Sequence, residues 1–138
     1  MKLRLALTIA FACATASLSA ATITIDTASL SFDPNAMHWF VSSKVCNSSS
    51  SGFSGSLLYE LRLLRGDKYW SIGSEKSQNT LDHNKCRTYD KLNIQVNPKK
   101  VPTGEYQIQF VVSEWDGQRY IIRDTTTFTK TFVRGGGE

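Results

Sequence analysis

The sequence predicts an all-β fold, a single antiparallel β-sandwich of two sheets and about seven strands. Two long stretches have the pattern of β-hairpins, with apolar side chains at every second position. The chain contains no convincing amphipathic helix. Two hairpins that each present one apolar face can bury those faces against each other, so a sandwich is the simplest architecture for them.

The first hairpin is predicted over residues 55–74. A two-residue turn at Gly66-Asp67 pairs Leu63 with Trp70 and Leu61 with Ile72. Glycine at the first turn position suits a type II′ turn, and the pairing keeps apolar residues on one face. That face consists of Leu57, Tyr59, Leu61, Leu63, Trp70 and Ile72.

The second hairpin is predicted over Glu105 to Phe132, and its register has two alternatives. A two-residue Asp116-Gly117 turn pairs Phe110 with Arg123, which puts an arginine on the core face. A three-residue loop, 115–117, pairs Phe110 with Ile122 and Val112 with Tyr120 instead. We prefer the second register, in which Gly117 takes the left-handed conformation of a bulged turn.

Three further strands complete the pattern, at residues 22–32, 37–46 and 88–96, the first with a possible break near Asp26. The serine-glycine segment 47–54 is predicted to be a mobile loop, and its Asn47-Ser48-Ser49 triplet matches a glycosylation pattern that is common by chance. The polar segment 75–87 is predicted to be a long loop. Short strands with turn residues between them are typical of an immunoglobulin- or fibronectin-like sandwich.

Residues 1–21 are predicted to be a secretory signal peptide. Two basic residues precede an apolar run over 5–18, and small residues follow it. A lipoprotein with Cys13 as the modified residue is a weaker alternative, because the residues before it match poorly. The apolar run is too short for a membrane-spanning helix. We therefore expect a secreted or periplasmic protein with a domain at 22–133 and a disordered tail at 134–138.

The charge balance gives no indication of nucleic-acid binding. The chain has 16 Lys and Arg against 12 Asp and Glu, and removal of Lys2 and Arg4 leaves 14 basic residues and a net charge of +2. No basic run or stripe stands out in the sequence.

Cys46 and Cys86 remain after the signal peptide, an even pair in an exported chain, which predicts a disulfide. His83 lies three residues before Cys86, but a metal site needs two more ligands, so no metal is predicted.

Candidate binding residues lie in two turns. The triplet Arg65-Gly66-Asp67 lies on a predicted hairpin tip, where integrin ligands place such a triplet, although the turn itself accounts for Gly and Asp. Trp115 and Asp116 lie at the other tip, where Trp115 and Tyr120 form a candidate aromatic patch. The preferred register instead places Tyr120 inside, with Trp115 folded back over the hairpin.

No catalytic residue is predicted. The two histidines differ in context, since His38 lies in an apolar strand and His83 in a polar loop. The three residues of a Ser-His-Asp site need not be adjacent in sequence, so the sequence leaves such a site open as an alternative. However, it contains no nucleophile elbow and no phosphate-binding loop. Three acidic residues of the second hairpin are too few for a calcium site, which needs six or more oxygen ligands. They are Glu114, Asp116 and Asp124.

Three segments in order resemble small β-sandwich modules of exported bacterial proteins. They are Gly55-Ser56-Leu57-Leu58-Tyr59-Glu60-Leu61, then Pro102-Thr103-Gly104-Glu105-Tyr106, then Ser113-Glu114-Trp115-Asp116-Gly117 with Asp124 and Phe128. The shared positions are mostly turn and core residues, so the resemblance implies a fold and no activity. In that class the modules often accompany larger secreted proteins, whereas here we expect a module that stands alone, and the sequence also carries Cys46 and Cys86.

The function predicted from the sequence is a non-enzymatic exported binding module without a cofactor. It would contact a protein or a glycan through loop tips or a sheet edge. A small inhibitor or immunity protein that acts on an exported enzyme is one alternative. A structural subunit that assembles by lending residues 22–25 to a neighbouring sheet is another.

Overall fold

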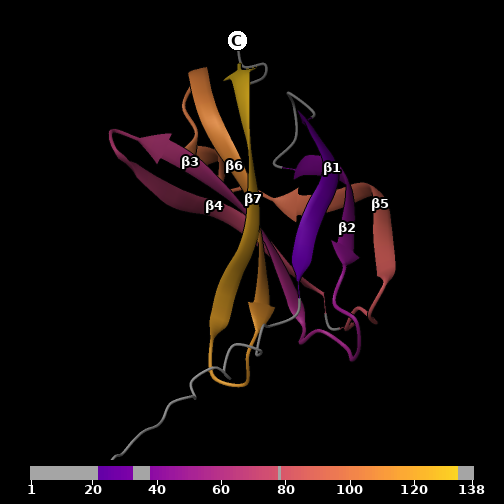
Figure 1. Ribbon diagram of the computed structural model, residues 1–138. Helices are drawn as coiled ribbons and strands as arrows, with labels where there is room; N and C mark the ends of the chain where they lie inside the picture. The colour runs from indigo at the N-terminus through magenta and orange to yellow at the C-terminus, as the bar shows by residue number, and fades with distance from the viewer. Residues whose placement is uncertain (1–21, 33–37, 78, 134–138) are drawn as a thin grey trace, which may run out of the picture.

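The computed structural model describes residues 22–32, 38–77 and 79–133, and it confirms the predicted all-β sandwich (Figure 1). Within these residues the strands are β1 (Ile23–Phe32), β2 (His38–Asn47), β3 (Leu57–Arg65), β4 (Lys68–Ser77), β5 (Lys85–Gln95), β6 (Gly104–Trp115) and β7 (Tyr120–Phe132). One 3-10 turn, η2 (Pro98–Lys100), precedes β6. The predicted signal peptide, the predicted turn at 33–35 and the predicted tail lie outside the described residues.

The strands divide into a three-stranded sheet of order β1-β2-β5 and a four-stranded sheet of order β4-β3-β6-β7. All paired strands are antiparallel. The two sheets form the two layers visible in Figure 1, with β1 next to β7 along one side. Residues 75–77 extend β4 and 85–87 extend β5, so the predicted long loop is shorter than expected.

The core lies between the sheets and follows the period-two pattern of the sequence. Alternate residues of β3 face inward, and so do alternate residues of β2 and β6. The fully buried side chains include Trp39, Val41, Val45, Leu57, Tyr59, Leu61, Leu63, Ile108, Phe110 and Val112. Burial raises the pKa of Tyr59, and so does its hydrogen bond to the Tyr89 hydroxyl at 3.2 Å.

The β3–β4 hairpin has the predicted two-residue turn, and Gly66 has a φ of 65°. Leu63 pairs with Trp70 as predicted, but a bulge makes Leu61 pair with Gly73 in place of Ile72. The prediction that Trp70 is part of the core face is wrong, because its side chain is 57% exposed. Trp70 lies on β4, an edge strand of the sheet. A side chain on the inner face of an edge strand has a neighbouring strand on one side only, so it can remain exposed.

The β6–β7 hairpin adopts neither of the two predicted registers. Trp115 pairs with Tyr120 across a connection at 116–119, and a bulge on β7 then pairs Phe110 with Thr126. Gly117 has a positive φ of 106° as predicted. Phe110 is fully buried, but Ile122 is 46% exposed and does not belong to the core.

The predicted β6–β7 register is wrong because two charged residues form a pair on the inner face of the four-stranded sheet. The register preferred from the sequence keeps Arg123 away from the core face. In the structure the Arg123 Nε donates to the Glu114 Oε1 at 2.9 Å, and Glu114 is only 6% exposed. A paired, hydrogen-bonded arginine is tolerated where an unpaired one is not.

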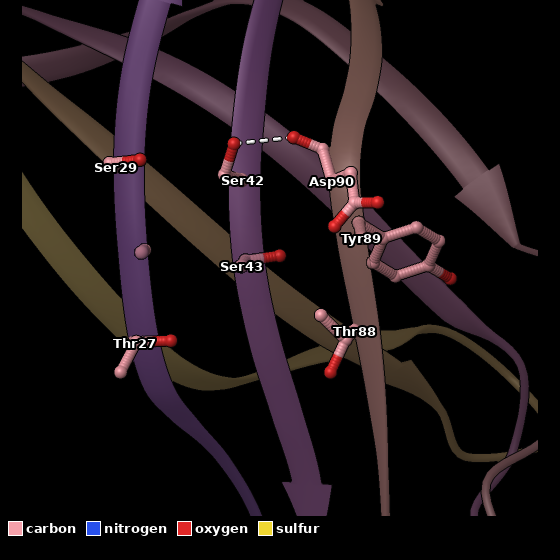
Figure 2. A pocket seen from close by; sticks show the side chains of 8 residues that line it. Thr27, Ser29, Ser42, Ser43, Thr88, Tyr89 and Asp90 are labelled. Carbon is pink, nitrogen blue, oxygen red and sulfur yellow. Dashed lines mark hydrogen bonds between the residues drawn. The ribbon is translucent and has the colours of Figure 1, made fainter.

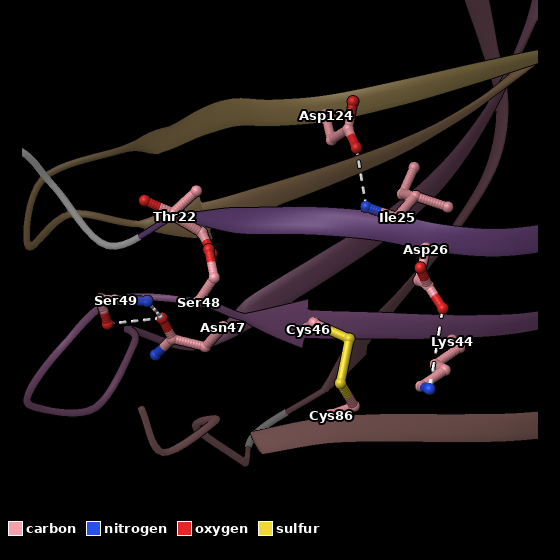
Figure 3. The surroundings of a disulfide bond; sticks show 10 residues. All are labelled: Thr22, Ile25, Asp26, Lys44, Cys46, Asn47, Ser48, Ser49, Cys86 and Asp124. Atoms are coloured by element: carbon pink, nitrogen blue, oxygen red, sulfur yellow. Dashed lines mark hydrogen bonds and ion pairs between the residues drawn. A yellow bond between two sulfur atoms is a disulfide. The ribbon is translucent and has the colours of Figure 1, made fainter. Parts of the chain in front are cut away.

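The predicted disulfide between Cys46 and Cys86 is present, with an S–S distance of 2.07 Å (Figure 3). The two cysteines face each other in register on β2 and β5, so the bond joins neighbouring strands of one sheet. It lies beside the β1 irregularity at Asp26, near the break predicted in the first strand.

A second irregularity, between β2 and β5, opens a hollow in the three-stranded sheet (Figure 2). The register shifts between Val41 and Ser43, and the Ser42 hydroxyl donates to the Asp90 carbonyl across the gap. Hydroxyl-bearing side chains from all three strands surround it, namely Thr27, Ser29, Ser42, Ser43, Thr88 and Tyr89.

Candidate binding surface at the loop end

Three connections meet at one end of the sandwich, which lies at the bottom of Figure 1 and which we call the loop end. They are residues 48–56, 79–84 and 116–119. The Ser54 N–H donates to the Leu81 carbonyl and joins the first two connections, and the N–H of Trp115, the last residue of β6 before the third connection, donates to the Ser56 carbonyl, both at 2.9 Å. The loops that a sandwich offers for recognition are therefore fixed relative to one another here.

The serine-glycine loop, predicted to be mobile, has both of its ends anchored by buried polar side chains. Asn47 is 1% exposed, and its amide nitrogen donates to the Leu81 carbonyl at 2.8 Å. The Ser54 hydroxyl accepts from the Leu81 N–H at 2.9 Å and donates to the Gly55 carbonyl at 2.7 Å. The side-chain amide that the glycosylation pattern singles out is thus already engaged inside the fold.

Gly55 connects this loop to the second hairpin. Its N–H donates to the Glu114 Oε2 at 2.7 Å, so Glu114 holds Gly55 with one oxygen and Arg123 with the other. A Cβ atom at Gly55 would lie 2.0 Å from the Trp115 carbonyl oxygen. Only glycine allows the two segments to approach this closely.

We therefore expect Gly55→Ala to destabilise the protein by about 3 kcal/mol, because a backbone atom cannot rotate away from the added methyl group. Gly52→Ala is the matched control in the same loop. Gly52 has a φ of 85°, but a Cβ atom added there would have no other atom within 4 Å. The cost of Gly52→Ala therefore comes from the left-handed backbone conformation alone, about 1 kcal/mol. Urea unfolding of both variants measures the difference. Equal losses would contradict the close approach at Gly55.

Asp116 shapes the turn at 116–119. Its Oδ1 accepts from the Gln118 N–H at 2.8 Å and from the Arg119 N–H at 2.9 Å, and its own N–H donates to the Arg119 carbonyl at 3.0 Å. The backbone N–H of Arg119 has the largest effect and that of Gln118 the next largest, and both lower the pKa of Asp116 below its ordinary value of 3.8. The candidate binding residue Asp116 is therefore a turn-forming residue, with its carboxylate directed at its own backbone.

Since the folded-state pKa is lowered, Asp116 stabilises the turn above pH 3.8, and this contribution is lost as the pH falls through the folded-state value. An NMR titration that follows the Asp116 carboxyl carbon is expected to give a midpoint below 3.8. A midpoint for Asp116 at or above 3.8 would show that the two N–H bonds do not persist in solution.

An exposed cluster of apolar and aromatic side chains lies beside this turn, on the outer face of the four-stranded sheet. We call Trp115, Tyr120, Ile122 and Lys76 the loop-end patch. Trp115 pairs with Tyr120, and the next pair whose side chains face outward is Ser113 with Ile122. The side chains of Trp115, Tyr120 and Ile122 therefore share the outer face. Lys76 is in the same row, because it pairs with Leu58, which pairs with Ser113.

The contacts within the loop-end patch are between rings and a cation. The rings of Trp115 and Tyr120 meet edge to face with their centroids 5.1 Å apart, and the Lys76 Nζ lies 5.7 Å from the Tyr120 centroid. The expectation that Tyr120 is inside is wrong, since it is half-buried on the outer face. Trp115 does pack against the hairpin, yet it stays 40% exposed.

The four predicted binding residues do not form one site. Trp115 and Asp116 belong to the loop end, whereas Arg65 and Asp67 lie at the β3–β4 turn, at the opposite end of β3. The Arg65 guanidinium donates to the Lys100 carbonyl, so the arginine of the triplet is tied to η2 and does not project freely from the tip. Nothing in the sequence marks Lys76 and Ile122 as neighbours of Trp115, because only the strand register brings them together.

The histidines and acidic residues have separate contacts. The His38 Nδ1 lies 2.9 Å from the Asn93 Oδ1, and the His83 Nδ1 lies 2.8 Å from the Asp82 Oδ1. Asp124 accepts from the Ile25 N–H at 2.7 Å and so attaches β1 to β7. The described residues hold no group of three or more potential metal ligands. They also include no helix long and apolar enough to cross a membrane.

The fold defines the class of the protein, a two-sheet antiparallel β-sandwich with a disulfide inside its three-stranded sheet. No family model matches the chain, and no curated protein matches it. The resemblance to exported bacterial modules stays a prediction that rests on the residues quoted above.

Proposed function

We propose that the protein is an exported, non-enzymatic binding module that contacts a partner protein through the loop-end patch. The observation that carries the proposal is the exposure of Trp115 and Ile122 side by side with Tyr120 on one face of the sheet. Aromatic residues with aliphatic neighbours are enriched at the centres of protein interfaces. A disulfide in the domain supports export, because such bonds persist in oxidising compartments.

The rigidity of the surroundings supports this use of the surface. The turn beside Trp115 is held by Asp116, and the adjoining loop is held by Glu114 through Gly55. A side chain that is already ordered loses less conformational entropy on binding. The Lys76 ammonium, next to the Tyr120 ring, provides a polar group at the rim of the apolar surface.

Photo-crosslinking in the exporting cell tests the proposal. A crosslinking amino acid at Tyr120 is expected to capture one stoichiometric protein, and the same group at Thr129, exposed on the outer side of β7, is expected to capture none. With the purified partner, the Trp115→Ala/Ile122→Ala variant is expected to bind at least tenfold more weakly, the loss of one or two dominant contacts. Unchanged affinity in that variant would reject the loop-end patch.

The identity of the captured protein separates the alternatives. An exported enzyme that loses activity on binding would make this chain an inhibitor or immunity protein. Capture of a second copy of the chain would indicate self-assembly. For strand exchange, however, β1 would have to leave its own sheet, where it pairs with β2 along its length and buries Ile23 and Leu30.

A further inference from the structure

The end of the sandwich opposite to the loop end has a group of cations that the sequence does not reveal. Arg65 and Lys68 flank the β3–β4 turn, where they pair in register, and Lys99 and Lys100 belong to η2. The Arg65 guanidinium donates to the Lys100 carbonyl, so the two segments are in contact. All four side chains are exposed, and within the described residues none of them forms an ion pair.

Two of these cations, Arg65 and Lys100, line a small hollow beside an exposed indole. Arg65, Trp70, Ser71, Ile72 and Lys100 line a cavity of about 100 Å³. Trp70 is 57% exposed, while Ile72 next to it is buried. Arg65, Lys68 and Trp70 share one face of the hairpin, since Arg65 pairs with Lys68, and Lys68 and Trp70 are two residues apart.

Both cations at the hollow are positioned by backbone contacts. Arg65 is held at Lys100, and the Lys100 Nζ lies 3.4 Å from the Ser71 carbonyl oxygen. Each contact uses one N–H, so other donors of the guanidinium and the ammonium are available to a ligand. Neither cation has an acidic partner in the part of the chain that the structure describes, and two such neighbouring cations favour an anionic group between them. Asp67, in the turn itself, is the acidic residue close to them in sequence.

We propose that this hollow binds an acidic saccharide, with a carboxylate of the sugar between Arg65 and Lys100 and the sugar ring against the Trp70 indole. Guanidinium groups form charge-assisted, bidentate hydrogen bonds to carboxylates. An exposed indole provides an apolar face with a defined orientation for the C–H groups of a sugar ring. The hollow is smaller than the roughly 300 Å³ of an ordinary small-molecule pocket, so it fits one charged group of a longer chain that lies across the surface.

Two other anionic partners fit this surface less well. A peptide that adds as a strand needs the free edge of β4, but the Asn97 N–H and the Lys100 Nζ already lie 3.4 Å from the Ile72 and Ser71 carbonyl oxygens. A lipid surface favours several exposed apolar residues together. Among the described residues, the other large exposed apolar side chains do not adjoin this hollow: Phe53, Trp115 and Ile122 belong to the loop end, and Val133 follows β7, at the opposite edge of the sheet from β4.

Calorimetric titration of the full chain with a short oligogalacturonate tests this proposal. The same oligosaccharide with its carboxyl groups reduced to alcohols is the neutral probe and is expected not to bind. Trp70→Ala and Lys100→Gln are each expected to weaken binding by roughly tenfold, the loss of one dominant contact. Lys85→Gln is the matched control at the loop-end start of β5 and is expected to change affinity less than twofold.

Thermal unfolding of the variants separates a loss of binding from a loss of structure. Because Trp70 and Lys100 are exposed, we expect little change in the unfolding temperature of either variant. Equal binding of the neutral probe, unchanged affinity in Trp70→Ala, or equally tight binding of polyglutamate would overturn the proposal, and so would the absence of any binding. Binding to anionic phospholipid vesicles alone would assign the site to a headgroup instead. The Trp115→Ala/Ile122→Ala variant is expected to retain oligogalacturonate binding, so the result does not depend on the loop-end patch.

Discussion

Replacement of both Cys46 and Cys86 by serine is expected to lower the free energy of unfolding by about 4 kcal/mol. The disulfide closes a loop with a sequence separation of 40 residues. In the chain-entropy model, a cross-link of this span removes about that much free energy from the unfolded chain. The folded state depends on it less, because β2 and β5 remain joined by their ladder on the Ser43 to Asn47 side.

Urea unfolding of the oxidised protein and of the double-serine variant measures this loss. The m-value of the variant is expected to rise, since its unfolded chain is no longer cross-linked and exposes more surface. Lys44→Ser/Thr88→Ser is the matched control, because these residues pair on the same two strands two positions away. It removes only the exposed ion pair of Lys44 with Asp26, worth about 1 kcal/mol or less. A loss in the cysteine variant no larger than in this control would show that the disulfide does not restrict the unfolded chain.

The features that sequence analysis found are those that local chemistry determines. The β3–β4 turn follows from Gly66, which takes a positive φ in a two-residue loop, and the turn then fixes the pairing of Leu63 with Trp70. The disulfide follows from an even cysteine pair in a chain with an export signal pattern. In both cases a single short segment, or a single pair, leaves few alternatives.

The features that it missed depend on distant residues. Parity assigns a side chain to a face of a strand but not to the centre or edge of a sheet, so Trp70 was expected in the core and is exposed. The partner of Arg123, Glu114, could not be identified before the register was known. The cations at the hollow come from the β3–β4 hairpin and from η2, with Arg65 and Lys100 35 residues apart, so no basic run marks them in the sequence.

Phe110→Ala is expected to cost about 4 kcal/mol, whereas Ile122→Ala is expected to cost about 0.5 kcal/mol. Phe110 is fully buried and stacks on Tyr59 with a centroid distance of 6.1 Å, so truncation leaves a cavity between the sheets. Ile122 pairs with Ser113 on the outer face and is 46% exposed. These two residues face each other in the register preferred from the sequence, and that register predicts a large loss for both.

Chemical denaturation of the two variants therefore reads the register of the β6–β7 hairpin directly. If Phe110→Ala fails to fold, Phe110→Leu keeps most of the volume and still gives a measurable loss, while Ile122→Val provides the corresponding small change outside. A loss above about 2 kcal/mol for Ile122→Ala would place this side chain in the core. Tyr120, two residues away on the same face, would then turn inward as well, and the loop-end patch would not exist. The stability of one exposed isoleucine variant thus tests the surface on which the proposed partner binding depends.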